Sequence, residues 1–204
     1  MPDFSAQSLL ASLRATSAAE WIAVATGVFY ILLIMRRNRW GWLAGGISSL
    51  ILAVIAARSH LPMQALLQLF YVAAAVYGWW SWAPQTQPQQ VSIWTWRGHA
   101  LALAACLTVS LGLARLLAGE GYSAFPFIDS LVACAGLFAT WLVARVYLEN
   151  WLYWIVIDVV SLFLFLSQGL VVAASLFAIY LVISVVGLRS WWRIRRDDQR
   201  VAAG

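Results

Sequence analysis

Long apolar runs separated by short polar breaks set the pattern of this chain. Windows of about 19 residues, the length that spans a bilayer as a helix, locate seven apolar runs. The runs cover residues 20–36, 40–57, 61–82, 98–118, 127–147, 151–167 and 169–192. The longest breaks are the polar linker 83–97 and the turn 119–126. The pattern therefore predicts an all-α integral membrane protein with seven transmembrane helices.

The composition agrees with this class. Of the 204 residues 63% are hydrophobic and only 10% are charged, far from the balance of a soluble domain. Residues 1–19 lack the order of a cleaved signal peptide, and we expect them to form an outside segment with a short interfacial helix. Cys106 and Cys134 have no Cys or His at ligand spacing, so we expect no disulfide, metal or cofactor. His60 and His99, at opposite membrane faces, are expected to be solvated.

The placement of the basic residues predicts the orientation in the membrane. All thirteen are Arg, and if the first helix starts outside, ten lie at inner ends and three at outer ends. The positive-inside rule then predicts an outside N-terminus and a cytoplasmic C-terminus with a basic tail, 193–204. The net charge of +5 thus indicates orientation and contact with anionic membrane lipid rather than binding of nucleic acid.

The second half of the chain resembles the first. At an offset of 109 residues, Gly27 matches Gly136 and Phe29 matches Phe138. The offset then becomes 112, where the matched pairs are Asn38 with Asn150, Trp42 with Trp154 and Ser49 with Ser161. It returns to 109 for Tyr71 with Tyr180 and Gly78 with Gly187. We therefore expect a three-residue insertion before the middle helix of the second unit. Units 20–82 and 127–192, joined by the lone helix 98–118, must point the same way. This predicts a 3+1+3 parallel repeat with a ligand site between the repeats near the midplane.

Polar and aromatic residues share one face of the sixth apolar run. Asn150, Trp151, Trp154, Asp158 and Ser161 recur at steps of three and four. An acid at a helix centre costs about 2.5–3.5 kcal/mol on insertion scales, so Asp158 should face the bundle interior and meet a partner. Aromatic faces beside an acid suit a flat cationic ring. The alternatives are an acid that serves packing alone and an interfacial belt of the two Trp residues.

Further candidate contacts lie in the first repeat and in the last helix. They are Asn38, Trp42, Ser48, Gln68, Tyr71 and Tyr180. Gln68 needs hydrogen-bond partners inside a membrane, and either a ligand or a neighbouring helix can supply them. Trp94 and Trp96, at the end of the polar linker, are expected in an interfacial aromatic belt.

Several enzyme classes are excluded because the chain lacks the residues that they require. The chain has no Lys, which excludes a P-loop and a Schiff base, and no G-x-S-x-G motif. The parallel repeat is an arrangement found in one class of membrane transporters, and two alternatives to a transporter stay open. One is an intramembrane enzyme that uses Asp129 and Asp158, and the other is a non-catalytic membrane assembly protein.

Four segments together resemble the PnuC family of vitamin-precursor transporters. They are RNRWGWLAGGISS, LLQLFYVAAAVYGWWSW, FPFID and YLENWLYWIVIDVVS, which occur in family order within residues 20–192. The resemblance implies a fold like that of the SWEET sugar transporters and a homotrimer in the bacterial inner membrane. It also implies facilitated diffusion of nicotinamide riboside, which a cytoplasmic kinase then traps by phosphorylation.

The same resemblance assigns residues and leaves alternatives. It places the family's W-x-x-W motif on Trp151 and Trp154, and its polar position in helix three on Gln68. Ser48, Ala75 and Asp158 stand where nicotinamide riboside transporters often carry Asn. Related members move thiamine or riboflavin, and thiamine also presents a cationic ring. Thiamine is therefore the alternative substrate.

Overall fold

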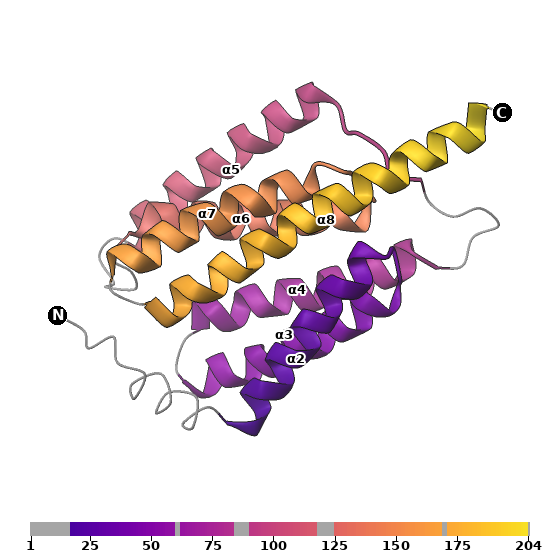
Figure 1. Ribbon diagram of the computed structural model, residues 1–204. Helices are drawn as coiled ribbons and strands as arrows, with labels where there is room; N and C mark the ends of the chain where they lie inside the picture. Colours follow the sequence, from indigo (N-terminus) through magenta and orange to yellow (C-terminus); the bar gives the residue numbers. More distant parts are fainter. Residues whose placement is uncertain (1–16, 60–61, 84–89, 118–124, 169–170, 204) are drawn as a thin grey trace. The chain divides into compact units, whose positions relative to one another are not determined.

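The computed structural model describes residues 17–59, 62–83, 90–117, 125–168 and 171–203. This part of the chain forms seven helices (Figure 1). They are α2 Ala18–Met35, α3 Trp40–Arg58, α4 Pro62–Ser81, α5 Trp96–Leu117, α6 Pro126–Ala144, α7 Asn150–Ser167 and α8 Val171–Ala203. The predicted interfacial helix before residue 17 and the solvated His60 lie outside the described residues.

Six of these helices are long and apolar enough to cross a membrane, which confirms a multi-pass membrane protein. The helix outside this group is α4, whose mean hydropathy is lowered by Gln64, Gln68 and the aromatic residues near its end. Its 20 residues still span about 30 Å at the usual helical rise. A crossing by α4 therefore stays a prediction.

Local signals explain most of the helix ends. Ser17 and Glu20 form a capping box at the start of α2, with the Ser17 N–H donating to Glu20 Oε2 at 2.6 Å. Pro126 occupies the first turn of α6, as the sequence predicts. The predicted end of this helix at residue 147 is wrong, because the backbone turns left-handed at Val146, where φ is 57°.

The C-terminal helix runs well past its predicted end. The sequence indicates a helix that stops at residue 192 and a separate basic tail, whereas α8 continues to Ala203. The tail contains no Gly or Pro before Gly204, and its Arg, Gln and Ala residues favour helix. The basic tail is therefore the last part of α8.

The helices form two compact units. The first contains Met1–Ala83 and Leu162–Ile179, and the second contains Pro84–Ser161 and Tyr180–Gly204. In the first unit α3 packs against both α2 and α4, so α3 is the central helix of the three (Figure 1). In the second unit α5 packs against α6. The expected lone connector is thus joined to a neighbour within its own unit.

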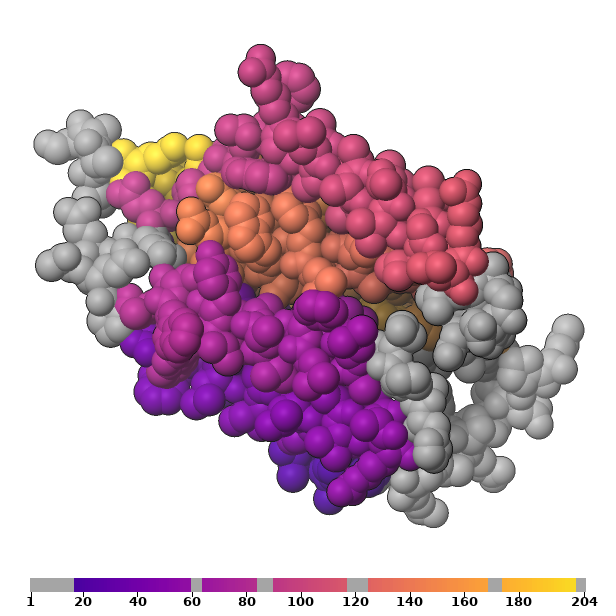
Figure 2. Space-filling model, turned by 180° about the vertical axis from the view of Figure 1, so that it is seen from behind, coloured from indigo at the N-terminus to yellow at the C-terminus, as the bar shows by residue number. Residues whose placement is uncertain are grey.

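Most side chains of α5 lie on the protein surface. Only 6% of its most apolar 18-residue window is buried, and Leu101 and Leu116 are 73% and 76% exposed. Figure 2 shows this helix on the visible face, in pink. An apolar helix with so little cover from its own chain is typical of a helix that faces lipid or another subunit.

The end of the linker is hydrogen-bonded to the turn between α6 and α7. The Ser92 N–H donates to the Val146 carbonyl at 3.1 Å, and the Ser92 carbonyl accepts from the Leu148 N–H at 2.9 Å. One step further on, the Trp94 N–H donates to Glu149 Oε1 at 3.0 Å. Three hydrogen bonds therefore hold the residues just before α5 against the α6–α7 turn. We call this contact, between Ser92 and Trp94 on one side and residues 146–149 on the other, the linker strap.

The linker strap brings two side chains, Trp94 and His99, into contact with α6 and α7. The Trp94 ring lies inside an aromatic cluster, with its centroid 4.9 Å from that of His99 and 5.3 Å from that of Trp141. His99 Nδ1 is 3.1 Å from the Tyr153 hydroxyl, and its Nε2 is 3.7 Å from Glu149 Oε1. The prediction of a solvated His99 is wrong, because the linker folds back onto the α6–α7 turn. The belt position of Trp94 stays a prediction.

Candidate substrate site

The same tight turn precedes the middle helix of each predicted repeat. Arg37 before α3 and Val146 before α7 have φ of 53° and 57°, respectively. The next residue closes both turns with a 2.9 Å bond, from the Asn38 N–H to the Leu33 carbonyl and from the Tyr147 N–H to the Leu142 carbonyl. These positions differ by 109 residues. The turn therefore contains no three-residue insertion.

In the first turn of the helix that follows each tight turn, a Trp ring packs on a Gly residue of the next helix. The Trp42 ring covers Gly78 in the first unit, and the Trp151 ring covers Gly187 in the second. Each indole also meets a second one edge to face. The Trp42–Trp82 centroids are 5.6 Å apart at 89°, and the Trp151–Trp191 centroids are 5.7 Å apart at 86°. We call each arrangement a Trp–Gly lock.

The two locks correct the expected register of the repeat. Trp42 matches Trp151 rather than Trp154, and Asn150 matches Gly41 rather than Asn38. The predicted offset of 112 in this region is wrong, because coincident Asn and Trp identities suggested an insertion that the backbone does not contain.

Asp158 lies at the middle of α7 and is 3% exposed. Its Oδ2 accepts a hydrogen bond of 2.8 Å from the Ser184 hydroxyl of α8. Tyr180 lies one helical turn before Ser184, on the same face of α8. The prediction that this acid faces the interior and has a partner is confirmed. A hydroxyl donor leaves the carboxyl group able to attract a cation.

The predicted polar face of α7 is its buried face. Asn150, Trp151, Asp158 and Ser161 are each at most 3% exposed, and Trp154 between them is half-buried. The Asn150 side-chain amide donates to the Tyr147 carbonyl at 2.6 Å. Asn150 Oδ1 and Trp151 Nε1 are buried without a hydrogen-bond partner among the described residues. The first turn of α7 therefore offers one acceptor and one donor that remain unsatisfied.

The remaining predicted contacts fall into three groups. Asn38 and Ser48 already bond to the protein: Asn38 Oδ1 accepts from the Trp40 N–H at 3.0 Å, and the Ser48 hydroxyl donates to the Ala23 carbonyl at 2.8 Å. Gln68 is 8% exposed in α4, and Tyr71 is half-buried nearly one turn further along that helix. Trp42, at 1% exposed, belongs to a Trp–Gly lock.

Sequence reasoning missed Ser184 and the partners of the locks. Ser184 lies four residues after Tyr180 and three before Gly187, and these spacings put the three on one face of α8. The signal was therefore present. The comparison of the two halves does not reveal it, because Ser184 corresponds to Ala75 in the first repeat.

Comparison with known proteins supports the resemblance. The family described as "Nicotinamide mononucleotide transporter" matches residues 17–193. The nicotinamide riboside transporter PnuC of Escherichia coli strain K12 is 28% identical, and the alignment covers 97% of each chain. The riboflavin/roseoflavin transporter RibM of Streptomyces davaonensis is 31% identical over 87% of this chain and 86% of its own.

The fold agrees with a solved relative. The crystal structure of the vitamin B3 transporter PnuC superposes with a TM-score of 0.70 at 21% identity, covering 94% of this chain and 87% of that one. This similarity shows that the chain has a PnuC-like fold. The family match covers most of the chain and identifies a transporter, which excludes the alternative of an enzyme built on Asp129 and Asp158. The chain therefore belongs to the nicotinamide mononucleotide transporter family, whose members include PnuC.

Proposed function

We propose that this protein carries nicotinamide riboside across the bacterial inner membrane by facilitated diffusion with alternating access. Phosphorylation in the cytoplasm then traps the substrate. Support comes from the PnuC relative, which matches this chain over 97% of its length. The observation that carries the choice of substrate is the buried carboxyl group of Asp158. A carboxyl group in this position favours a cationic ligand, and the pyridinium ring of nicotinamide riboside is cationic.

The groups around Asp158 suit the other parts of this molecule. In our proposal the half-buried Trp154 stacks on the pyridinium ring, while Asp158 balances its charge. Trp151 is held against Gly187 by its Trp–Gly lock. Its unsatisfied N–H and the unsatisfied Asn150 Oδ1 match the acceptor and donor of a carboxamide group. Tyr180 supplies a hydroxyl group for the ribose.

The remaining predictions complete the proposal. Gln68 and Tyr71 of α4 are proposed as further polar contacts. The recurrence of the tight turn and of the Trp–Gly lock at an offset of 109 supports the 3+1+3 parallel repeat, with units 20–82 and 127–192. We further propose an outside N-terminus, a cytoplasmic C-terminus and a homotrimer.

Riboflavin is a second candidate because the RibM relative is 31% identical. Thiamine, the alternative expected from the sequence, shares the positive charge of nicotinamide riboside. Charge separates riboflavin, which is neutral, from the two cationic vitamins, and competition between those two is decided by direct uptake of each. If Asp158 contacts a cationic ring, its neutralisation weakens transport of a cation and leaves transport of riboflavin almost unchanged.

The test is uptake of each radiolabelled vitamin into proteoliposomes that contain the purified protein, without an imposed gradient of pH. We expect saturable uptake of nicotinamide riboside. We expect the Asp158→Asn variant to lower kcat/KM by at least about tenfold, which corresponds to the roughly 1.4 kcal/mol of one charged contact. Asp129→Asn is the matched control, because Asp129 is an exposed acid in the first turn of α6.

Each of the other outcomes would refute a different part of the proposal. If only thiamine is taken up, and Asp158→Asn lowers its kcat/KM to the same extent, the proposed site is supported and the substrate is thiamine. Uptake of riboflavin that ignores Asp158→Asn would refute both the substrate and the role of the acid. If Trp154→Ala transports nicotinamide riboside as the wild type does, the stacking assignment is wrong.

A further inference from the structure

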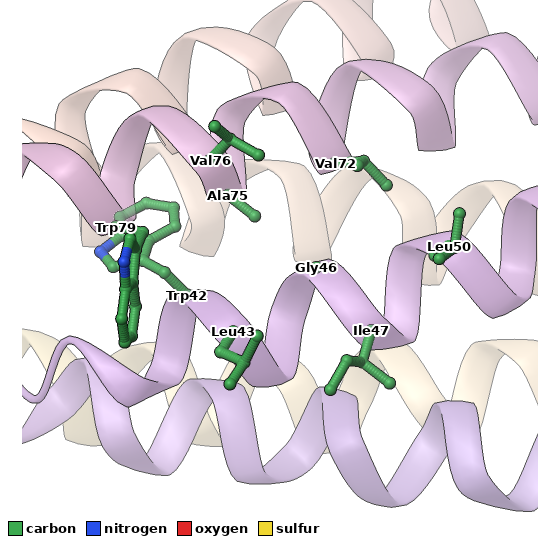
Figure 3. Close-up of a pocket in the computed structure, with 9 residues that line it drawn as sticks. All are labelled: Trp42, Leu43, Gly46, Ile47, Leu50, Val72, Ala75, Val76 and Trp79. Atoms are coloured by element: carbon green, nitrogen blue, oxygen red, sulfur yellow. The ribbon is translucent and has the colours of Figure 1, made fainter.

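A second candidate site lies away from α7, in a groove between α3 and α4 of the first unit. The groove has a volume of about 340 Å³ and is lined by nine residues, all shown in Figure 3. Trp42 and Trp79 lie at one end, and Leu50 lies toward the other (Figure 3). In between, a Cβ on Gly46 would be 3.3 Å from the Ala75 Cβ, so small residues bring the two helices close.

The lining of this groove suits hydrocarbon rather than a vitamin. All nine residues are aliphatic or Gly or Trp, and the Trp42 indole nitrogen is buried. The hydroxyl groups of a nucleoside would lose their bonds to water here and gain too few in return. Ile47 and Leu50 are 42% and 52% exposed, so the groove opens along the side of α3. From Trp42 to Leu50 it follows α3 for about 12 Å.

A positive charge lies at the Trp79 end of the groove. The Arg39 guanidinium carbon is 3.8 Å from the centroid of the Trp79 ring, which fixes the side chain by a cation–π contact. Arg39 Nε is buried and has no hydrogen-bond partner among the described residues. Buried donors of this kind are normally satisfied, and a guanidinium group is well suited to phosphate. Arg36 adds a second, exposed charge three residues away.

We propose that the groove binds an acyl chain of an anionic phospholipid and that Arg39 binds the phosphate group of the same molecule. Basic pockets between helices on the cytoplasmic side of a membrane bind acidic headgroups. The apolar groove beside Arg39 supplies the complementary site for the tail. This inference is independent of the proposed substrate.

The acidic residues argue against a second copy of the chain as the occupant. Every Asp and Glu in the described part of the chain already has an interaction within the chain. These are Glu20 with Ser17, Glu149 with Trp94, Asp158 with Ser184, Asp197 with Arg200, and the engaged Asp129 and Asp198. None of these carboxylates is therefore without a partner that Arg39 could replace, whereas an anionic leaflet supplies phosphate groups in excess.

The test is native mass spectrometry of the full-length protein, titrated with phosphatidylglycerol and with phosphatidylcholine of the same acyl chains. We expect the protein to prefer phosphatidylglycerol. The Arg39→Gln variant should bind it about fivefold more weakly, as expected for one basic residue near the membrane surface. Ile47→Asn, on the exposed wall of the groove, should weaken binding of both lipids. Arg58→Gln, at the other end of α3, and Leu107→Asn, on the exposed side of α5, are the matched controls.

Three results would overturn the proposal. The first is equal binding of the two lipids to the wild-type protein. The second is an unchanged preference in Arg39→Gln, with Ile47→Asn binding lipid normally. The third is a shift from oligomer to monomer in Ile47→Asn with lipid binding intact, because the groove would then be a contact between copies. None of these results bears on the substrate, since these variants leave α7 unchanged.

Discussion

The Trp–Gly lock of the second unit predicts that Gly187→Ala destabilises the protein. A Cβ at Gly187 would overlap the six-membered ring of Trp151, closer than real Cβ contacts allow. The ring has little room to move, because Trp151 is 3% exposed and its edge-to-face partner Trp191 is 0% exposed. One methyl group must therefore displace a buried indole or push α7 and α8 apart.

Two opposing contributions set the magnitude. Overpacking by a methyl group in a tight core costs about 1–3 kcal/mol. Replacing Gly with Ala inside a helix returns about 0.5–1 kcal/mol, because the unfolded chain loses less conformational entropy on folding. The net change is a destabilisation of up to about 2.5 kcal/mol, with the middle of the range at about 1–2 kcal/mol. For a chain of this size each kcal/mol moves the unfolding midpoint by about 2–4 °C, so the expected fall is roughly 2–8 °C.

The assay is thermal unfolding in detergent, followed by the emission of the Trp residues. Gly112→Ala is the matched control, because no atom lies within 4 Å of a Cβ built at Gly112 in α5. The same substitution there should leave the midpoint unchanged or raise it. Combining Gly187→Ala with Trp151→Phe should recover part of the loss, since the smaller ring frees space. If Gly187→Ala unfolds at the same temperature as Gly112→Ala, the lock does not constrain the helices and our reasoning is refuted.

Two further predictions concern hydrogen bonds in the second unit. Ser184→Ala removes the 2.8 Å bond to Asp158, and we expect it to lower the unfolding free energy by about 1 kcal/mol, measured as a fall in the unfolding midpoint. An unchanged midpoint would show that another group replaces the hydroxyl. Glu149→Ala removes the acceptor of the Trp94 N–H and should make the linker before α5 more accessible to protease. Glu149→Gln keeps an acceptor oxygen and should resist cleavage, and equal cleavage of both variants would contradict this role of the side chain.

The helices could be predicted from sequence because each depends on its own residues. An apolar run and a Pro in the first turn were sufficient to place α6 to within a residue at its start. Its end was missed, because the left-handed turn at Val146 is formed by a β-branched residue that rarely adopts it. The partial burial of His99 was missed for a different reason. It depends on Tyr153 and Glu149, and nothing near His99 in the sequence indicates them.

The candidate site was likewise predicted only in part from the sequence. The spacing of Asn150, Trp151 and Asp158 predicted one shared face, and the structure buries all three. The spacing did not show that the Trp151 ring packs on Gly187, so both Trp residues seemed equally suited to hold a ligand. Identity between matched residues also proved a poor guide to register. Hydrogen bonds of the backbone turn, rather than the side chains, fix which positions of the two halves correspond.

The corrected register makes the protein a natural scaffold for redesign. At an offset of 109 the acid–hydroxyl pair of the second half, Asp158 and Ser184, corresponds to Ser49 and Ala75 in the first. The halves share a framework of turn and lock but differ in chemistry at this pair. A protein engineer could therefore transplant the pair with two substitutions, Ser49→Asp and Ala75→Ser, or exchange it for neutral residues, and leave the framework untouched.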